Sequence, residues 1–171
     1  MEFVDLYDEN RNLTGEKIER GTKIPQGRYK LSVHMWVTNE CGEIYVQKRA
    51  TCRKIFPNKW ENPGGGVVAG QDSEITLHKE YEEELGRKLS NNYSLIATIR
   101  REKDFVDIYH IIDNFDVDRL QLQVEEVAEA KWVTIDEINA MIARGEFCPT
   151  IMDSFNPFLD YIINKRTYKT R

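Results

Sequence analysis

Four glutamates lie within five residues near the middle of this 171-residue chain: Glu80, Glu82, Glu83 and Glu84. On a helix, Glu80, Glu83 and Glu84 would share one face, because residues three and four apart are neighbours there. Like charges at that spacing repel and weaken the helix. Carboxylate oxygens are ligands that Mg²⁺ and Mn²⁺ prefer. The spacing therefore indicates half of a divalent-metal site, with a solvated acidic helix face as the alternative.

A glycine-rich turn precedes the acidic segment and favours the metal interpretation. The turn runs from Pro63 to Gly66 and contains three consecutive glycines. Glycine adopts backbone conformations closed to other residues and allows a ligand to approach the backbone closely. We therefore expect main-chain carbonyl groups of this turn, and that of Gly65 in particular, to join the ligands of the metal.

The acidic segment is expected to form a helix with one packed side. Ser73 is a suitable N-cap residue, because its hydroxyl can accept a hydrogen bond from the first helical turn. Leu77, Tyr81 and Leu85 follow the spacing i, i+4, i+8 and form an apolar stripe beside the glutamates. One side of the helix would then pack on the protein while the other meets a ligand.

The whole segment from residue 65 to residue 86 resembles the Nudix box. That pattern runs Gly, five residues, Glu, seven residues, then Arg-Glu-apolar-x-Glu-Glu-x-Gly-apolar. With Gly65 as the first glycine, Glu80, Glu83, Glu84 and Gly86 stand at the expected positions. Four matches at fixed spacing make this a specific resemblance.

Three positions depart from the box, and a fourth fits it loosely. Gln71 replaces the isolated Glu, Lys79 replaces the Arg, and Arg87 replaces the closing apolar residue, while Tyr81 is only partly apolar. In the family the isolated Glu and the Arg brace the loop against the helix. The resemblance therefore implies a neutral contact between Gln71 and Lys79 here, which changes the scaffold more than the metal ligands.

Patterns elsewhere in the chain predict a mixed sheet flanked by helices. Strands are expected at 30–37, 43–48, 93–101, 105–114 and 127–133, with a hairpin joining the first two. A capping box, Thr134 to Glu137, opens a helix that ends near Arg144, and Pro157 precedes a closing helix. The resemblance, which covers roughly residues 28–145, implies the same architecture: the α/β/α sandwich of the Nudix fold.

The N-terminal stretch brings a second enzyme class into consideration. Residues 5–8 through 14–15 resemble the Nudix branch that includes isopentenyl-diphosphate isomerase. Isomerases of that branch place a catalytic cysteine shortly after the Trp-x-Asn that begins here at Trp60, and they hold their metal partly with histidines. This chain has neither feature, and the nearest cysteine in sequence is Cys52. We therefore favour a hydrolase over an isomerase, and a diphosphate-binding module without turnover is the third alternative.

The resemblance implies attack of water on a diphosphate, assisted by Mg²⁺ or Mn²⁺. Glu80 and Glu84 are the first candidates for metal ligands, and Glu83 is a ligand or the base that activates water. A carboxylate on a later loop often joins the site in this family, and Glu126 or its neighbour Glu125 is the expected donor. A solvated loop is the alternative for that pair.

Three further residues are candidates for substrate binding. Arg49 and Arg53 present forked donors that match phosphate oxygens, although each would also suit an ordinary surface. Trp60, beside the glycine turn, is expected to anchor the core or loop and could also contact the substrate. His34, His78 and His110 share no ligand spacing, and we interpret them as structural.

Length and composition set the remaining expectations. The chain is long enough for one domain, residues 1–171, with an N-terminal extension at 1–27 and a loose basic tail at 165–171. The net charge of −5 argues against general nucleic-acid binding. The absence of a long apolar run and of a signal-like start argues against membrane insertion and export. Three scattered cysteines indicate free thiols in the cytoplasm. A homodimer is a possible assembly of the chain, and the sequence does not determine the oligomeric state.

Overall fold

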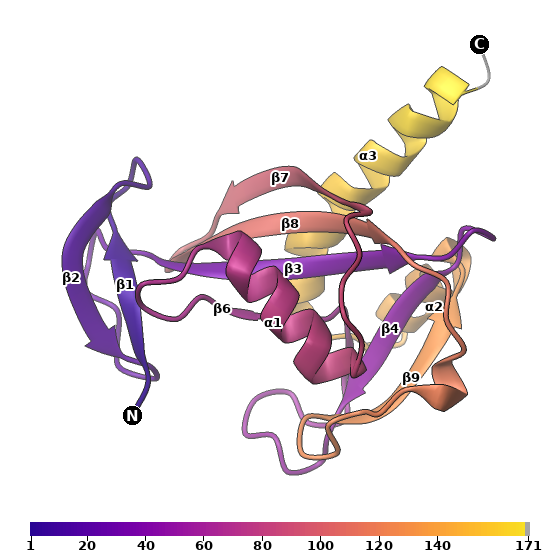
Figure 1. The fold of residues 1–171 in the computed structure, drawn as a ribbon, viewed down its shortest axis with the longest axis horizontal. Helices are drawn as coiled ribbons and strands as arrows, with labels where there is room; N and C mark the ends of the chain where they lie inside the picture. Colours follow the sequence, from indigo (N-terminus) through magenta and orange to yellow (C-terminus); the bar gives the residue numbers. More distant parts are fainter. Residues whose placement is uncertain (170–171) are drawn as a thin grey trace.

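The computed structural model describes residues 1–169 of the chain and the side chains of residues 1–164 (Figure 1). An N-terminal hairpin pairs strands β1 (Phe3–Tyr7) and β2 (Leu13–Glu19). The mixed sheet contains β3 (Lys30–Thr38), β4 (Ile44–Arg49), β5 (Trp60–Glu61), β6 (Gly64–Gly66), β7 (Tyr93–Arg100), β8 (Asp104–Ile112) and β9 (Val127–Val133). The helices are α1 (Ser73–Leu85), α2 (Ile135–Ala143) and α3 (Met152–Lys169), with short 3₁₀ helices at Val117–Arg119 and Pro149–Ile151. This is the α/β architecture with a mixed sheet that the sequence predicts.

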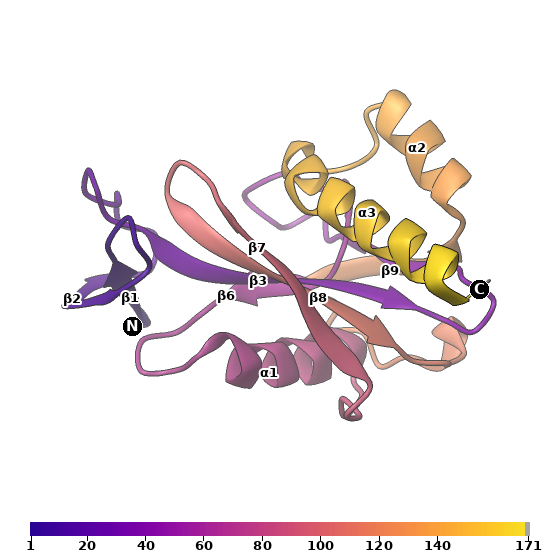
Figure 2. The same ribbon diagram turned by 90° about the horizontal axis from the view of Figure 1, so that it is seen from above.

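The central strand β3 has a hydrophobic core on each of its faces. Its odd-numbered apolar residues pack with the buried stripe of α1, which confirms that stripe as a packed face. Trp36 points to the opposite face and stacks on Phe155 and Phe158 of α3, with ring centroids 5.2 and 4.9 Å away. Alternate residues of a strand face opposite sides, which explains the two cores. Figure 2 shows α1 on one side of the sheet and α2 and α3 on the other.

The predicted hairpin between β3 and β4 forms, but the strands separate almost at once. Their paired residues are Thr38 and Ile44 alone. Beyond this point β3 pairs with the glycine strand β6, through Ser32 to His34, and β4 pairs with β5 and β9. On its other edge β3 pairs in parallel with β8 over nine residue pairs. The divergence inserts the glycine turn into the sheet directly under α1.

The C-terminal helix begins earlier than predicted. It starts at Met152, directly after a 3₁₀ turn, and Pro157 lies inside it rather than before it. A proline inside a helix loses one hydrogen bond, but burial of Phe155 and Phe158 against Trp36 holds the first turns in place. Residues 165–169 continue this helix along the segment predicted to be a loose tail, while residues 170 and 171 lie outside the described part. No helix within residues 1–169 is long and apolar enough to cross a bilayer.

Candidate functional site

Helix α1 is capped at both ends by residues of the acidic segment. Asp72, not Ser73 as predicted, is the N-cap, and its carboxylate accepts a hydrogen bond of 2.8 Å from the amide of Ile75. The hydroxyl of Ser73 instead shares a 2.8 Å hydrogen bond with the hydroxyl of Tyr109. Gly86 ends the helix in the left-handed conformation and donates its amide to the carbonyl of Glu82. The two caps therefore fix the ends of α1, so that Glu80, Glu83 and Glu84 lie in its last two turns.

Two of those glutamates lie directly against the glycine turn. The amide of Gly64 donates a 3.0 Å hydrogen bond to the carboxylate of Glu84. A Cβ atom added at Gly65 would lie only 2.3 Å from the carboxyl carbon of Glu80. Any side chain at position 65 would therefore displace Glu80, so the close approach requires glycine. The turn and the helix form one unit.

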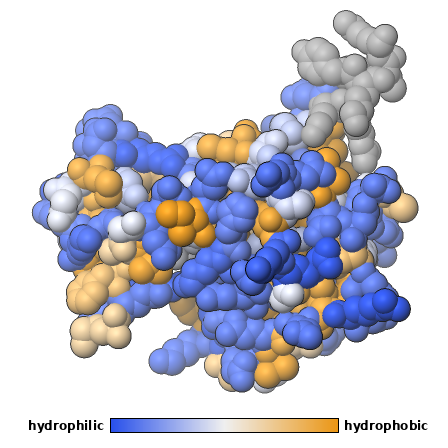
Figure 3. Space-filling view, viewed as in Figure 1, coloured by the Kyte–Doolittle hydropathy of each residue, from blue (hydrophilic) through white to orange (hydrophobic). Residues whose placement is uncertain are grey.

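Helix, turn and three further segments line a pocket of about 200 Å³, here called the acidic pocket. It is lined by Glu2, Arg20, Arg49, Arg53, Glu61, Gly64, Gly65, Lys79, Glu80, Glu83, Glu84 and Glu126. The lining contains charged residues and glycines but no aliphatic or aromatic side chain. Figure 3 shows that the face carrying α1 is mainly hydrophilic around it. Such a lining suits small charged groups, not the organic part of a large ligand.

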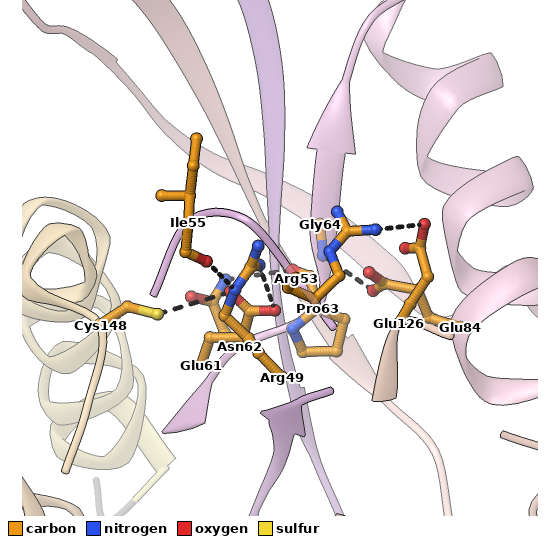
Figure 4. Close-up of polar contacts among 10 residues, drawn as sticks. All are labelled: Arg49, Arg53, Ile55, Glu61, Asn62, Pro63, Gly64, Glu84, Glu126 and Cys148. Atoms are coloured by element: carbon orange, nitrogen blue, oxygen red, sulfur yellow. Dashed lines mark hydrogen bonds and ion pairs between the residues drawn. The ribbon is translucent and has the colours of Figure 1, made fainter. Parts of the chain in front are cut away.

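Each basic side chain that lines the pocket is paired with an acidic one. The pairs are Arg20–Glu2, Arg49–Glu61 at 2.8 Å, Arg53–Glu126 at 2.8 Å and Lys79–Glu83 at 3.8 Å. Figure 4 shows the two central arginine pairs on either side of the turn. Glu80 and Glu84 are the lining carboxylates that form no ion pair with a described basic side chain.

Burial disfavours the charged form of these two carboxyl groups. It raises the pKa of Glu84 well above its ordinary value of 4.5, with further contributions from the charges of Glu61 and Glu80. Burial also raises the pKa of Glu80, and the neighbouring Glu83 adds to the effect. A cation between them would reverse that penalty, because an opposite charge favours the ionised carboxylate. The electrostatics therefore favour a bound cation.

The donor set fits a hard divalent cation, although the side chains are not arranged as a closed metal site. Within the described residues, no group of three or more His, Cys, Asp or Glu side chains is positioned to hold a metal ion. Glu83 is turned to Lys79, Glu126 to Arg53, and Glu84 to the amide of Gly64. Each of these three carboxylates thus has a protein partner that a cation would have to replace.

A second, smaller pocket of about 130 Å³ adjoins the acidic pocket and shares Glu61 with it. Cys148 lines it and lies 3.7 Å from the carboxylate of Glu61. His34 lines it as well and forms a 2.9 Å hydrogen bond with Ser154. Burial lowers the pKa of His34 to about 4, so this imidazole is neutral at physiological pH.

Several candidates predicted from the sequence line the acidic pocket. Glu80, Glu83, Glu84, Glu126, Gly65, Arg49 and Arg53 do so. Glu125 lies instead on the loop surface beside Cys52, whose thiol donates to its carbonyl oxygen at 3.3 Å. Trp60 lines neither pocket: it is 8% exposed in the core, and Lys131 lies 4.4 Å above its ring. The burial of Trp60 is that of a side chain that anchors the core.

The predicted contact between Gln71 and Lys79 is not formed. Lys79 pairs with Glu83, and the side-chain oxygen of Gln71 is buried without a hydrogen-bond partner. The lysine lies on the same helix as Glu83, one turn away, so its nearest acid is local. Three lining residues, Glu2, Arg20 and Glu61, were not identified from the sequence, and only Glu61 carried a signal, next to the glycine turn.

The fold and the paired helical glutamates define a class: the chain belongs to the Nudix family and is an acid anhydride hydrolase. The family model described as the NUDIX domain matches residues 28–150. An uncharacterized Nudix hydrolase of Listeria monocytogenes is 33% identical over 172 residues, covering 99% of this chain and 98% of that protein. Nudix hydrolases generally depend on divalent metal ions.

Solved structures show the same fold at lower identity. A Deinococcus radiodurans crystal structure superposes with a TM-score of 0.74 at 22% identity, covering 86% of this chain and 92% of the other. The Nudix domain of NrtR from Shewanella oneidensis, solved with ADP ribose, gives a TM-score of 0.62 at 14% identity, covering 78% and 88%. These similarities establish the Nudix fold of this chain.

Proposed function

We propose that this protein cleaves a diphosphate linkage of a nucleoside-diphosphate-type or other organic diphosphate by attack of water, with Mg²⁺ or Mn²⁺ as the cofactor. The observation that carries the proposal is the pair of buried carboxylates, Glu80 and Glu84, which lie against the glycine turn and form no ion pair with a basic side chain of residues 1–164. Burial raises the pKa of both carboxyl groups, and a cation bound between them would favour their ionised forms.

Glu80, Glu84 and Glu83 are the proposed metal-holding side chains, with the main chain of Gly65 completing the set. Bound there, a divalent cation would neutralise charge on the phosphate oxygens and lower the pKa of a water molecule. Glu83 and Glu126 are the proposed bases, because each is partly exposed and its present partner is a basic side chain that a phosphate can take over.

The two central arginines are proposed to hold the diphosphate. Arg49 is fixed by Glu61 and by the carbonyl of Ile55, at 2.8 and 2.9 Å, so its guanidinium is oriented before substrate binds. Among the described residues, the side chain of Arg53 forms its ion pair with Glu126, at 2.8 Å. Recruitment of Glu126 to a cation would release Arg53 for a phosphate. The ion pairs thus hold both guanidinium groups at the acidic pocket.

The organic group of the substrate would lie outside the acidic pocket, because that pocket is lined by charged residues and glycine. The adjoining 130 Å³ pocket opens from the same turn and offers neutral polar groups, including His34. It is large enough for a small polar group next to the diphosphate. The substrate is proposed to be a small molecule that the protein meets in the cytoplasm, a compartment that suits its three free cysteines.

One observation supports an isomerase as the second candidate. Cys52, the thiol considered from the sequence, is exposed and lies outside the acidic pocket. Cys148, which is distant in sequence, lies beside Glu61 at the boundary of the two pockets (Figure 4). Burial raises the pKa of this thiol to about 12, so it remains protonated and could donate a proton to carbon. The position of this thiol at the boundary of the two pockets is the observation that keeps the isomerase as the second candidate.

A substrate screen tests the proposal. The purified protein is incubated with Mg²⁺ or Mn²⁺ and with nucleoside triphosphates, nucleotide sugars, dinucleotides or isoprenoid diphosphates. We expect metal-dependent release of a phosphate product and equal turnover in Cys52→Ser and Cys148→Ser. Double-bond migration without phosphate release, lost in Cys148→Ser but kept in Cys52→Ser, would establish the isomerase instead. Binding of a diphosphate without any turnover would identify a binding module.

A further inference from the structure

The N-terminal hairpin contributes two charged residues to the acidic pocket. The family match starts at residue 28 and does not include the hairpin. Glu2 directly precedes β1 and Arg20 directly follows β2, and both line the pocket together with the helical glutamates. A basic side chain from outside the matched region therefore lines the pocket together with the proposed metal-holding residues.

Backbone hydrogen bonds hold this hairpin on the glycine-rich loop. The amide of Ala69 donates to the carbonyl of Phe3 at 2.8 Å, and the amide of Gly70 donates to the carboxylate of Asp5 at 2.6 Å. The guanidinium of Arg20 lies beside Gly66, where a Cβ atom would be 3.5 Å from its terminal nitrogen. The position of Arg20 relative to the turn is thus set by the backbone.

Arg20 is also the arginine of the pocket whose partner is most easily replaced. Its side chain is 49% exposed, compared with 17% for Arg49 and 36% for Arg53. Its partner Glu2 is 37% exposed and belongs to the first residues of the chain. Exposed ion pairs contribute little to stability, whereas a guanidinium and a phosphate form strong paired hydrogen bonds. A phosphate oxygen can therefore displace Glu2.

We propose that Arg20 binds a phosphate group of the substrate on the hairpin side of the glycine turn, and that Glu2 holds Arg20 before substrate binds, as an internal competitor of that phosphate. The inference deepens the proposed function and rests on it. It assigns the substrate to organic di- or polyphosphates whose phosphate chain extends past Gly66. The arginine would bind and orient this chain without contacting the attacking water.

Two substitutions separate this role from a purely structural one. Arg20→Ala removes the phosphate ligand, so binding of inorganic pyrophosphate in the presence of Mn²⁺ should weaken about tenfold, the loss expected for a charge-assisted contact. Glu2→Gln removes the competitor but keeps the arginine, so binding should strengthen about threefold. A structural ion pair would give both variants the same sign of change. Calorimetric titration of the full chain measures all three affinities.

The double variant and a matched pair provide the controls. Glu2→Gln combined with Arg20→Ala should bind pyrophosphate like Arg20→Ala alone, because the competitor acts only through the arginine. Arg28 forms an ion pair with Glu16, a residue of the same hairpin, and lines neither pocket. Arg28→Ala should leave the affinity for pyrophosphate unchanged. For a hydrolysed substrate, Arg20→Ala should raise KM with kcat nearly unchanged.

Equal pyrophosphate affinity in wild type and Arg20→Ala, or weakening in both Arg20→Ala and Glu2→Gln, would overturn the assignment of Arg20. The titration gives this answer whether or not turnover is seen. Failure of the proposed function would give a different result: the wild-type protein would hydrolyse no diphosphate with either metal. The pyrophosphate affinities of the variants would still test the role of Arg20 in that case.

Discussion

Glu84 is the most deeply buried of the carboxylates proposed to hold the metal ion. Its carboxylate is 4% exposed, accepts a hydrogen bond from Gly64 and lies near the charges of Glu61 and Glu80. A protein gains nothing in stability from such an acid, because burial penalises its charged form. The cation proposed for this pocket would favour the ionised form of the carboxyl group. Two predictions follow from this proposal at the scale of single residues.

Replacing Glu83 or Glu84 by Gln should lower kcat by at least about 10²-fold, the scale expected when a positioned acid-base or charge-stabilising group is lost. Glu82→Gln is the matched control, since it makes the same change on the same helix at an exposed position outside the pocket. Steady-state turnover of the substrate found by screening measures the effect. An equal loss of kcat in all three variants would show that turnover depends on the total charge of the helix and not on the carboxylates that line the pocket.

Stability of the metal-free protein should respond to pH through Glu84. A carboxyl whose pKa is raised in the folded state keeps its proton there after the unfolded chain has lost it, so stability falls as pH rises above 4.5 toward the folded pKa. Glu84→Gln should remove this loss and make the metal-free protein more stable near neutral pH. Urea unfolding in a chelator, from pH 4 to pH 8 in roughly unit steps, compares the two. If the free energy of unfolding changed with pH in the same way in both proteins, burial of Glu84 would not be the cause of the pH dependence.

At the scale of elements, the glycine strand β6 and helix α1 act as one unit. Strand β6 pairs with β3 and passes so close to α1 that Glu80 occupies the space of a side chain at Gly65. The divergence of β3 from β4 makes room for this strand in the sheet. The helix supplies the acids, and the turn determines where their oxygens lie.

Gly65→Ala and Gly66→Ala test this unit with the same change at adjacent positions. A Cβ at residue 65 would be 2.3 Å from Glu80, whereas one at residue 66 would meet only Arg20, at an ordinary 3.5 Å. Neither glycine has a positive φ, so alanine adds no backbone strain. We expect Gly65→Ala to lower kcat at least about tenfold by displacing Glu80, and Gly66→Ala to stay within about twofold. Similar turnover in the two variants would show that Glu80 tolerates displacement.

At the scale of the whole molecule, the N-terminal hairpin is joined to the sheet as well as to the pocket. Arg11 forms paired contacts of 2.8 and 2.5 Å with the carboxylate of Asp107, whose side chain is fully buried in β8. Tyr7 pairs with Tyr29 through two backbone hydrogen bonds, of 2.8 and 3.0 Å. These contacts hold the N-terminal hairpin against the mixed sheet.

Arg11→Ala should destabilise the whole chain. It leaves the buried carboxylate of Asp107 without its basic partner, and removing one member of such a pair costs about 3 kcal/mol. Arg28→Ala, which breaks an exposed pair with Glu16, should lower the free energy of unfolding far less, because exposed ion pairs contribute little to stability. Denaturant unfolding measures both. If the two variants were equally stable, the hairpin would contribute to the pocket without contributing to the fold.

The sequence alone determined the parts of the site that depend on local spacing. The i, i+3, i+4 order of the glutamates, the stripe at Leu77, Tyr81 and Leu85, and the glycine turn are set within a few residues, because a helix repeats every 3.6 residues. The fold followed from the same kind of evidence, since strand and helix patterns are local. The capping box at Thr134 was confirmed for the same reason.

Tertiary structure decided which charges meet. Arg20 lies 60 residues before Glu80, which lines the same pocket, and Arg53 lies 73 residues before its partner Glu126, so no sequence spacing could show that these residues lie close together. Cys148 reaches Glu61 in the same way, while Cys52, closer in sequence, does not. Burial of Glu84 is likewise a property of everything packed around it. Contacts between distant segments and loss of solvent depend on the path of the whole chain, which a linear pattern does not contain.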